Sequence, residues 1–233
     1  APLRRGQETL HIKFGLASGI LSGDRMLVQA WQALEKAPNH AIPMLLHRFN
    51  TTAAEVCEGQ QLDMDFEQRT SVSTLEYEHM IRLKTAVLLG FSLEAGALSG
   101  GAASQTAQAL YRFGVDLGIA FQIKDDWLDA FGAIQEVGKQ TGGDILAHKK
   151  TWLWIQALEH DQEAMQALDG LPDRDRVQAT LALFRKHGLD QKALELAGRW
   201  KEKAMEALDE ARLSKEGNDF FKAFADFLVD RNY

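Results

Sequence analysis

The chain has 233 residues, of which 45% are hydrophobic and 25% are charged, the composition of an ordinary globular protein. Its formal net charge of −7 argues against a nucleic-acid-binding surface, which is usually basic. A single cysteine excludes both a disulfide framework within the chain and a zinc site made of cysteines. No apolar run reaches the length of a membrane span, and no signal peptide is recognisable, so we expect a cytoplasmic protein.

Helical periodicity dominates the sequence, and no alternating strand pattern persists. The four prolines lie at the terminus, between helical patterns or at their starts. The sequence therefore predicts an all-α fold that forms one domain over residues 1–233. The predicted helices lie near residues 9–21, 24–36, 42–60, 74–98, 104–131, 151–168, 173–187, 189–213 and 217–230.

Two of these helices are expected at the centre of the fold. The segments 74–98 and 104–131 are apolar around most of their circumference, which is typical of buried helices. The small residues between them, Gly96 to Ser104, predict a turn. Ser73 and Glu76 have the spacing of a capping box, with Ser73 as the N-cap, and so predict where the first of the two helices begins.

Three carboxylates lie within five residues of the second central helix: Asp125, Asp126 and Asp129. Together with Gln122 they share one helix face, because residues three and four positions apart are neighbours on a helix. Like charges one turn apart repel each other by roughly 0.2–0.5 kcal/mol on an exposed helix, and a bound cation relieves this repulsion. Carboxylate oxygens suit Mg²⁺, which usually binds one or two carboxylates together with substrate phosphates. The alternative interpretation is a solvated acidic helix face.

A glycine-rich stretch that contains lysines follows the carboxylates. Gly138, Gly142 and Gly143 permit backbone turns that other residues resist. Lys139 and Lys149 can then reach back towards the same pocket, where an ammonium group suits phosphate oxygens. Carboxylates for a divalent metal, with cations beside them, indicate a diphosphate substrate.

The stretch from Phe121 to Thr151 resembles the second aspartate-rich motif of the trans-polyprenyl diphosphate synthases, the family of farnesyl and geranylgeranyl diphosphate synthases. Residues 3–9, 55–63 and 77–86 resemble the RRG, EGQ and KT segments of the same family. The resemblance implies an isoprenoid-synthase-type helical bundle around a central cavity. It also implies a homodimeric prenyltransferase that depends on Mg²⁺, with Mn²⁺ as a substitute. Such an enzyme condenses isopentenyl diphosphate with an allylic diphosphate into a short- to medium-chain prenyl diphosphate.

The resemblance also implies a role for each matching residue. The metal site would consist of Asp125, Asp126 and Asp129, with Asp126 acting indirectly or through water. The catalytic set would be Lys84, Thr85, Gln122, Asp125 and Lys139. The substrate-binding residues would be Arg4, Arg5, Lys84, Thr85, Gln122, Lys139 and Lys149. Among these, Arg4 would contact the allylic diphosphate and Arg5 the isopentenyl diphosphate.

The first aspartate-rich motif of the family, expected immediately before the RRG segment, is not in this sequence, which starts at Ala1. We expect that a longer parent chain carries it together with the N-terminal helices. One alternative is a truncated, non-catalytic subunit that modulates a complete partner. Another is a related class I terpenoid synthase such as a cyclase, which the GK and KT segments disfavour. The sequence defines neither the length of the product nor the preferred allylic primer.

Overall fold

The computed structural model of the chain describes residues 2–4, 6–132 and 142–230. Its internal contacts divide the chain into two compact units, Ala1–Arg48 and Phe49–Tyr233. Helix α3 (Ile42–Glu67) runs from the first unit into the second. A single domain over the whole chain therefore stays a prediction.

The first unit begins with a hairpin of two short strands, β1 (Leu3–Arg4) and β2 (Gln7–Glu8), which pair antiparallel. The turn between them contains Gly6, whose φ of 74° lies in the left-handed region that favours glycine. Helices α1 (Leu10–Phe14) and α2 (Leu16–Leu34) follow the hairpin.

Two details of this unit differ from the sequence-based prediction. The strands were not predicted because each has only two residues, too few to produce an alternating pattern. The break between the first two helices falls at Gly15 rather than near residues 22–23. Gly15 has a φ of 88°, which a helix cannot accommodate, whereas Gly23 lies inside α2.

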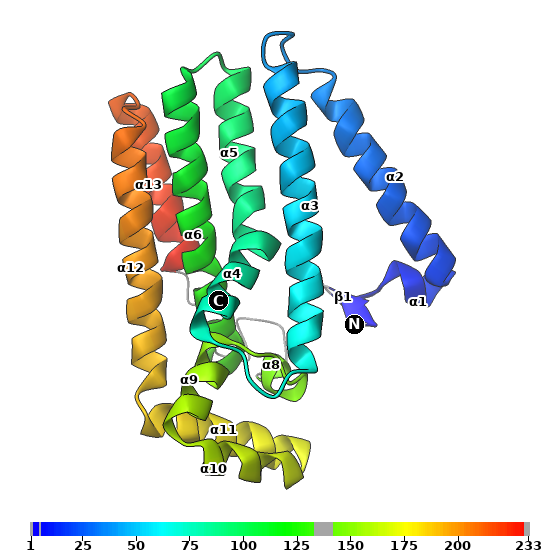
Figure 1. Cartoon of the computed structure of the whole chain (residues 1–233), viewed down its shortest axis with the longest axis vertical. Coiled ribbons are helices and arrows are strands. Elements are labelled where there is room, and N and C mark those ends of the chain that lie inside the picture. The colour runs from blue at the N-terminus through cyan, green and yellow to red at the C-terminus, as the bar shows by residue number, and fades with distance from the viewer. Residues whose placement is uncertain (1, 5, 133–141, 231–233) are drawn as a thin grey trace. The chain divides into compact units, whose positions relative to one another are not determined.

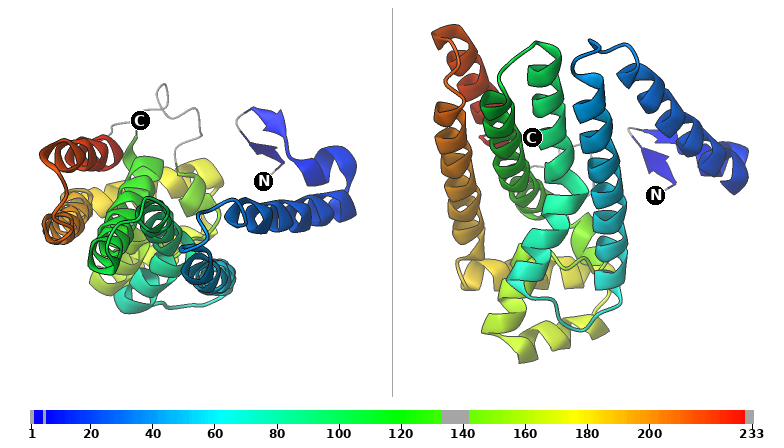
Figure 2. Two further views of the ribbon diagram at one scale, coloured as in Figure 1. Left: turned by 90° about the horizontal axis from the view of Figure 1, so that it is seen from above. Right: turned by 45° about the horizontal axis from the view of Figure 1, so that its top comes forward.

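The second unit is built around α6 (Ser104–Phe131), a helix of 28 residues. Helices α5 (Val87–Ser99) and α12 (Leu189–Glu210) pack along it, and α13 (Lys215–Val229) packs against both α6 and α12 (Figures 1 and 2). The remaining elements of this unit are α4 (Thr74–Ile81), a π-helical turn η1 (Arg82–Ala86), α8 (Gly143–Leu146), α9 (Trp152–His160), α10 (Gln162–Ala167), the 3₁₀ turn η2 (Leu168–Gly170) and α11 (Asp173–Lys186).

Helix α6 is held tightly at the centre of this unit. Its side chains Phe113, Leu117 and Ile123 are fully buried. A Cβ atom on Gly114 would lie only 2.7 Å from the Cα of Gly90 on α5, so the two helices touch almost backbone to backbone. Only glycine permits this approach. The position of α6 against the segment η1–α5 is therefore fixed by packing.

The all-α prediction is confirmed, and so is the capping box. The hydroxyl of Ser73 accepts a hydrogen bond from the Glu76 backbone, and the Glu76 carboxylate accepts one from the Ser73 backbone. The helix predicted at 104–131 has the same bounds in the structure. Within the part of the chain that the structure describes, no helix is long and apolar enough to cross a membrane.

Three predicted helices differ in the structure: two are interrupted and one is extended. The helix expected at 74–98 contains the π-helical turn η1, which a periodic pattern does not reveal. The helix expected at 151–168 breaks at Asp161, whose side chain caps α10 by accepting a hydrogen bond from the backbone N–H of Ala164. The helix expected at 42–60 continues as far as Glu67, past Gly59.

Candidate active site

Four polar residues of α6 face the region where a site was predicted. Gln122 and Asp126 line a pocket in the second unit, and Asp125 and Asp129 lie half-buried on the same helix. The rotation of α6 about its axis is fixed from the other side, where the indole Nε1 of Trp127 donates a 3.0 Å hydrogen bond to a backbone carbonyl in the first turn of α12. The carboxylates therefore stand on an anchored helix.

A chain of hydrogen bonds connects three elements across the pocket. The Tyr77 hydroxyl on α4 donates to Asp126 Oδ2 at 2.7 Å, and Gln122 Nε2 donates to Asp126 Oδ1 at 2.9 Å. The Thr85 hydroxyl on η1 donates to Gln122 Oε1 at 2.9 Å. Both carboxylate oxygens of Asp126 thus accept hydrogen bonds, which orients the side chain and satisfies a group that is only 8% exposed.

Burial changes the pKa values of two residues in this hydrogen-bonded chain, Asp126 and Tyr77. It raises the pKa of Asp126 to about 7, and the negative charge of Asp144 adds to the rise, while the hydrogen bonds from Tyr77 and Gln122 oppose it. Burial also raises the pKa of Tyr77 well above its usual value. Tyr77 therefore remains a protonated hydrogen-bond donor towards Asp126.

Lys84 is positioned by a π-helical turn and by α3. The turn η1 contains Lys84, and π-helical turns occur often at functional sites. Helix α3 approaches this turn at Gly59, where a Cβ atom would lie 2.3 Å from the backbone nitrogen of Lys84. One helical turn further along α3, Asp63 forms an ion pair with Lys84, with 2.5 Å between Oδ2 and Nζ. The two side chains are 12% and 27% exposed, respectively.

The second cation of the pocket, Lys149, comes from the segment after α8. The start of α8 is tied to α6, because the backbone N–H of Asp144 donates to Asp129 Oδ2 at 2.9 Å and that of Gly142 donates to the Asp129 carbonyl at 2.8 Å. Lys149 Nζ lies 3.4 Å from Asp144 Oδ1. Burial lowers the pKa of Lys149, but the carboxylates of Asp144, Asp63 and Asp126 outweigh it, so the net change is upward.

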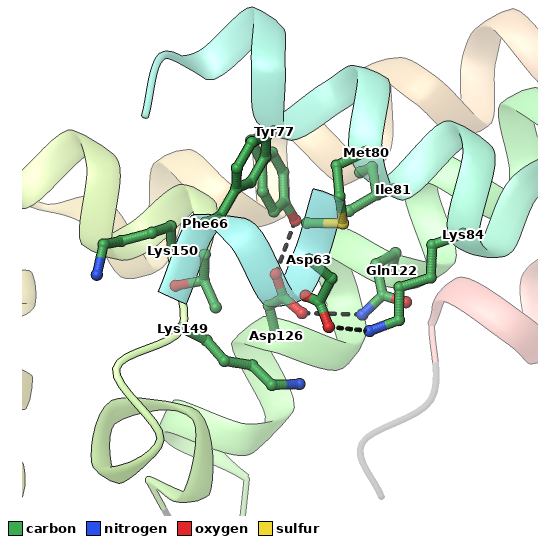
Figure 3. A pocket seen from close by; sticks show the side chains of 11 residues that line it. Asp63, Phe66, Tyr77, Met80, Ile81, Lys84, Gln122, Asp126, Lys149 and Lys150 are labelled. Carbon is green, nitrogen blue, oxygen red and sulfur yellow. Dashed lines mark hydrogen bonds and ion pairs between the residues drawn. The ribbon is translucent and has the colours of Figure 1, made fainter. Parts of the chain in front are cut away.

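Figure 3 shows how these side chains meet. Asp63 and Asp126 lie side by side, with the ammonium groups of Lys84 and Lys149 close to them. Lys150 points away from this group, and its Nζ donates to the backbone carbonyl of His148 at 3.0 Å. Among the residues that the structure describes, the pocket is lined by Asp63, Phe66, Tyr77, Met80, Ile81, Lys84, Gln122, Asp126, Lys149, Lys150 and Thr151.

The structure brings together four of the residues predicted from the sequence and joins a fifth to them. Lys84, Gln122, Asp126 and Lys149 share the pocket, and Thr85 reaches it through its hydrogen bond to Gln122. Asp125 and Asp129 lie on the same helix. Arg4 lies on β1 in the first unit. The predictions for Arg5 and Lys139 concern residues outside those that the structure describes.

Asp63 and Tyr77 make the ion pair with Lys84 and a hydrogen bond to Asp126, and neither was predicted from the sequence as a site residue. Asp63 lies one helical turn after Gly59 of the EGQ segment, and Tyr77 lies seven residues before Lys84. The spacing of Gly59 and Asp63 places both on one face of α3, which is a signal that the sequence contains. Nothing in the sequence indicates that Tyr77 meets Asp126, because their contact joins two separate helices.

The donor set is suited to Mg²⁺ bound mainly through substrate. Across residues 2–4, 6–132 and 142–230, no group of three or more His, Cys, Asp or Glu side chains could hold a metal ion. Mg²⁺ commonly uses only one or two carboxylates and takes its other ligands from water and phosphate. The half-buried carboxylates of Asp125 and Asp129, one helical turn apart, fit that requirement.

Comparisons with known proteins define the family of this chain. Residues 1–183 match the Polyprenyl synthetase family. The geranylfarnesyl diphosphate synthase of Natronomonas pharaonis is 34% identical over 99% of this chain and 68% of its own. The chain belongs to the polyprenyl synthetase family and is a prenyltransferase.

Solved structures show the same likeness. A geranylgeranyl pyrophosphate synthase superposes with a TM-score of 0.92 and 35% identity over 100% of this chain and 74% of its own. The polyprenyl synthase of Caulobacter crescentus, complexed with calcium and isoprenyl diphosphate, superposes with a TM-score of 0.88 and 27% identity. That match covers 100% of this chain and 71% of the Caulobacter chain.

Proposed function

We propose that the protein elongates an allylic diphosphate with isopentenyl diphosphate, and that the pocket around Asp126 is where the allylic diphosphate departs. The observation that carries this proposal is that Lys84 and Lys149 line one pocket with the buried carboxylate of Asp126, which Tyr77 and Gln122 hold by hydrogen bonds. A diphosphate leaving group needs preorganised cations, and an apolar wall is needed to exclude water from the carbocation.

The reaction begins with cleavage of the allylic C–O bond, whose electron pair stays with the diphosphate. The double bond of isopentenyl diphosphate then attacks the carbocation, and a proton is lost. Lys84 and Lys149 hold the diphosphate oxygens, and Thr85 with Gln122 orients the allylic group. Buried Phe66, Met80 and Ile81 supply the apolar wall of the pocket. The carboxylates of Asp125 and Asp129 would hold Mg²⁺, and the bound metal would supply positive charge that stabilises the departing diphosphate.

Three finer features belong to the same proposal. Mg²⁺ is the natural metal, with Mn²⁺ as a substitute, and the calcium in the Caulobacter relative supports a divalent cation at such a site. The protein acts in the cytoplasm and as a homodimer. Light scattering at micromolar concentration tests the oligomeric state, and a monomer would contradict the last of these features.

A single assay tests the reaction. The full-length protein is incubated with isopentenyl diphosphate and each of dimethylallyl, geranyl and farnesyl diphosphate, with and without Mg²⁺. We expect Mg²⁺-dependent products that end at one chain length, which defines both primer and product. Release of a cyclic hydrocarbon, or no elongation with any primer, would contradict the proposal.

A further inference from the structure

Asp63 places a second carboxylate in a pocket that is proposed to bind an anion. It lies on α3, lines the pocket, and is only 12% exposed on its side chain. Its carboxylate lies at the ion-pairing distance from Lys84, one of the two cations proposed to hold the diphosphate. Figure 3 shows the end of Lys84 directed at Asp63 rather than into open space.

The two cations proposed to bind the diphosphate already have carboxylate partners in this pocket: Lys84 pairs with Asp63, and Lys149 Nζ lies 3.4 Å from Asp144 Oδ1. Asp63 and Asp126 provide two carboxylates, and Lys84 and Lys149 provide two ammonium groups, while Lys150 is directed to the carbonyl of His148. An arriving diphosphate therefore meets cations that already have carboxylate partners. Lys84 can bind the diphosphate fully only when its ion pair with Asp63 is given up or shared.

We propose that Asp63 is a positioning residue that competes with the diphosphate for Lys84. This inference rests on the proposed function of the pocket. Without substrate, the Asp63 carboxylate holds the Lys84 ammonium group at the pocket and offsets its charge. During release of inorganic diphosphate, Asp63 takes Lys84 back. Asp63 thus weakens the binding of diphosphate and speeds its departure, which matters because product release limits turnover in many enzymes.

The geometry of α3 makes Asp63 specific for this task. Gly59 brings α3 into contact with the backbone of Lys84, and Asp63 is the residue one turn further on the same face. Asp65 lies only two residues away, but it is exposed, and its carboxylate accepts a 2.8 Å hydrogen bond from Gln61. The same helix therefore offers a matched control that removes an equal charge outside the pocket.

The first test measures binding of inorganic pyrophosphate by calorimetry, with and without Mg²⁺. We expect Asp63→Asn to bind pyrophosphate roughly three- to tenfold more tightly than the wild type, because Lys84 no longer has to leave a partly exposed ion pair when the anion arrives. Asp65→Asn is expected to stay within about twofold of the wild type, as a distant screened charge has little effect. Asp63→Glu, which keeps the charge, is expected to stay near the wild-type affinity.

A double-mutant cycle tests whether Asp63 acts through Lys84. In a Lys84→Gln background the ion pair no longer exists, so most of the gain from Asp63→Asn should disappear. An equal gain in both backgrounds would mean direct repulsion of the anion and would overturn the inference. Thermal unfolding of each variant confirms that it is folded, and Asp63→Ser, a second neutral replacement, takes the place of Asp63→Asn if that variant is unstable.

Steady-state kinetics supply a readout that a merely structural role would not produce. Asp63→Asn should lower KM and kcat together, because substrate binds more tightly and diphosphate leaves more slowly. A raised KM, or weaker or unchanged pyrophosphate binding, would overturn the inference. Two other outcomes would contradict the proposed function of the pocket rather than the role of Asp63 alone. These are a wild type that binds no pyrophosphate and a Lys84→Gln variant that binds pyrophosphate as tightly as the wild type.

Discussion

Tyr77 and Asp126 lie 49 positions apart in the sequence, and the hydroxyl of Tyr77 donates a 2.7 Å hydrogen bond to the carboxylate of Asp126. Tyr77→Phe removes this donor and leaves the buried Oδ2 atom of Asp126 without its hydrogen bond from Tyr77. We expect the free energy of unfolding at pH 8 to fall by about 1–3 kcal/mol, measured by urea denaturation. At pH 5, where Asp126 is protonated, the loss should be smaller because neutral hydrogen bonds are weaker. An equal loss at both pH values would contradict this account.

Asp126 also makes stability depend on pH. The ordinary pKa of an aspartate is 3.8, and the pKa of Asp126 rises to about 7 in the folded protein. Between pH 3.8 and pH 7 the folded state therefore binds more protons than the unfolded state. The contribution of Asp126 to stability therefore declines as pH rises from about 4 to about 7, by about 4 kcal/mol at most. Asp126→Asn should remove this decline, since Gln122 can turn its amide to suit the new side chain.

The pH experiment compares the thermal midpoints of the two proteins between pH 4 and pH 8 in metal-free buffer. As pH rises, the thermal midpoint of Asp126→Asn should increase relative to that of the wild type. A difference that is constant with pH would show that Asp126 titrates near its ordinary pKa in the folded protein.

Gly59 is required by the close approach of α3 to the turn that carries Lys84. A Cβ atom at position 59 would lie 2.3 Å from the backbone nitrogen of Lys84 and 2.7 Å from the carbonyl carbon of Leu83. Gly59→Ala must therefore push α3 and the turn η1 apart. We expect a loss of about 1–3 kcal/mol in the free energy of unfolding, and a fall in turnover because Lys84 moves.

The matched control is Gly198→Ala in α12, where a Cβ atom would meet nothing within 4 Å. That substitution should stabilise the protein by about 0.5–1 kcal/mol, because alanine favours the helix over glycine. Equal effects of the two substitutions on denaturant unfolding would contradict the argument for Gly59.

Asp125 is the carboxylate that we expect to matter most for the metal. Asp125→Ala should lower turnover by roughly a hundredfold or more, because several kcal/mol of transition-state stabilisation would be lost. The circular dichroism spectrum should remain that of a helical protein. Asp65→Asn, which removes a carboxylate outside the pocket, should retain turnover, and near-normal turnover of Asp125→Ala would remove this assignment.

Much of the fold could be predicted because helical periodicity is a local property of the sequence. The helix at 104–131 and the capping box at Ser73 depend on neighbouring residues and were predicted correctly. The π-helical turn at Lys84 was not, because it depends on packing against α3 and not on a local pattern.

The same distinction applies to the site. The spacing of Gln122 and Asp126 predicted one shared face of α6, and both residues line the pocket. Tyr77 and Asp63 were missed because each enters the pocket through a contact with a distant segment. Local patterns identify which residues a single helix presents together, but not which residues of another helix meet them.

Asp125, Asp126 and Asp129 stand on one unbroken helix, α6, whereas Lys84 and Lys149 come from separate elements. Along α6 each residue advances by about 1.5 Å and turns by about 100°, so the separation of Asp125 and Asp129 is set by the helix itself. One residue inserted between them would rotate Asp129 away from Asp125 and from the backbone of Asp144, to which it is bonded. Insertions after Lys149 would leave that spacing intact. Natural variation in segment length is therefore expected in the connections of this protein and excluded from the five positions from Asp125 to Asp129.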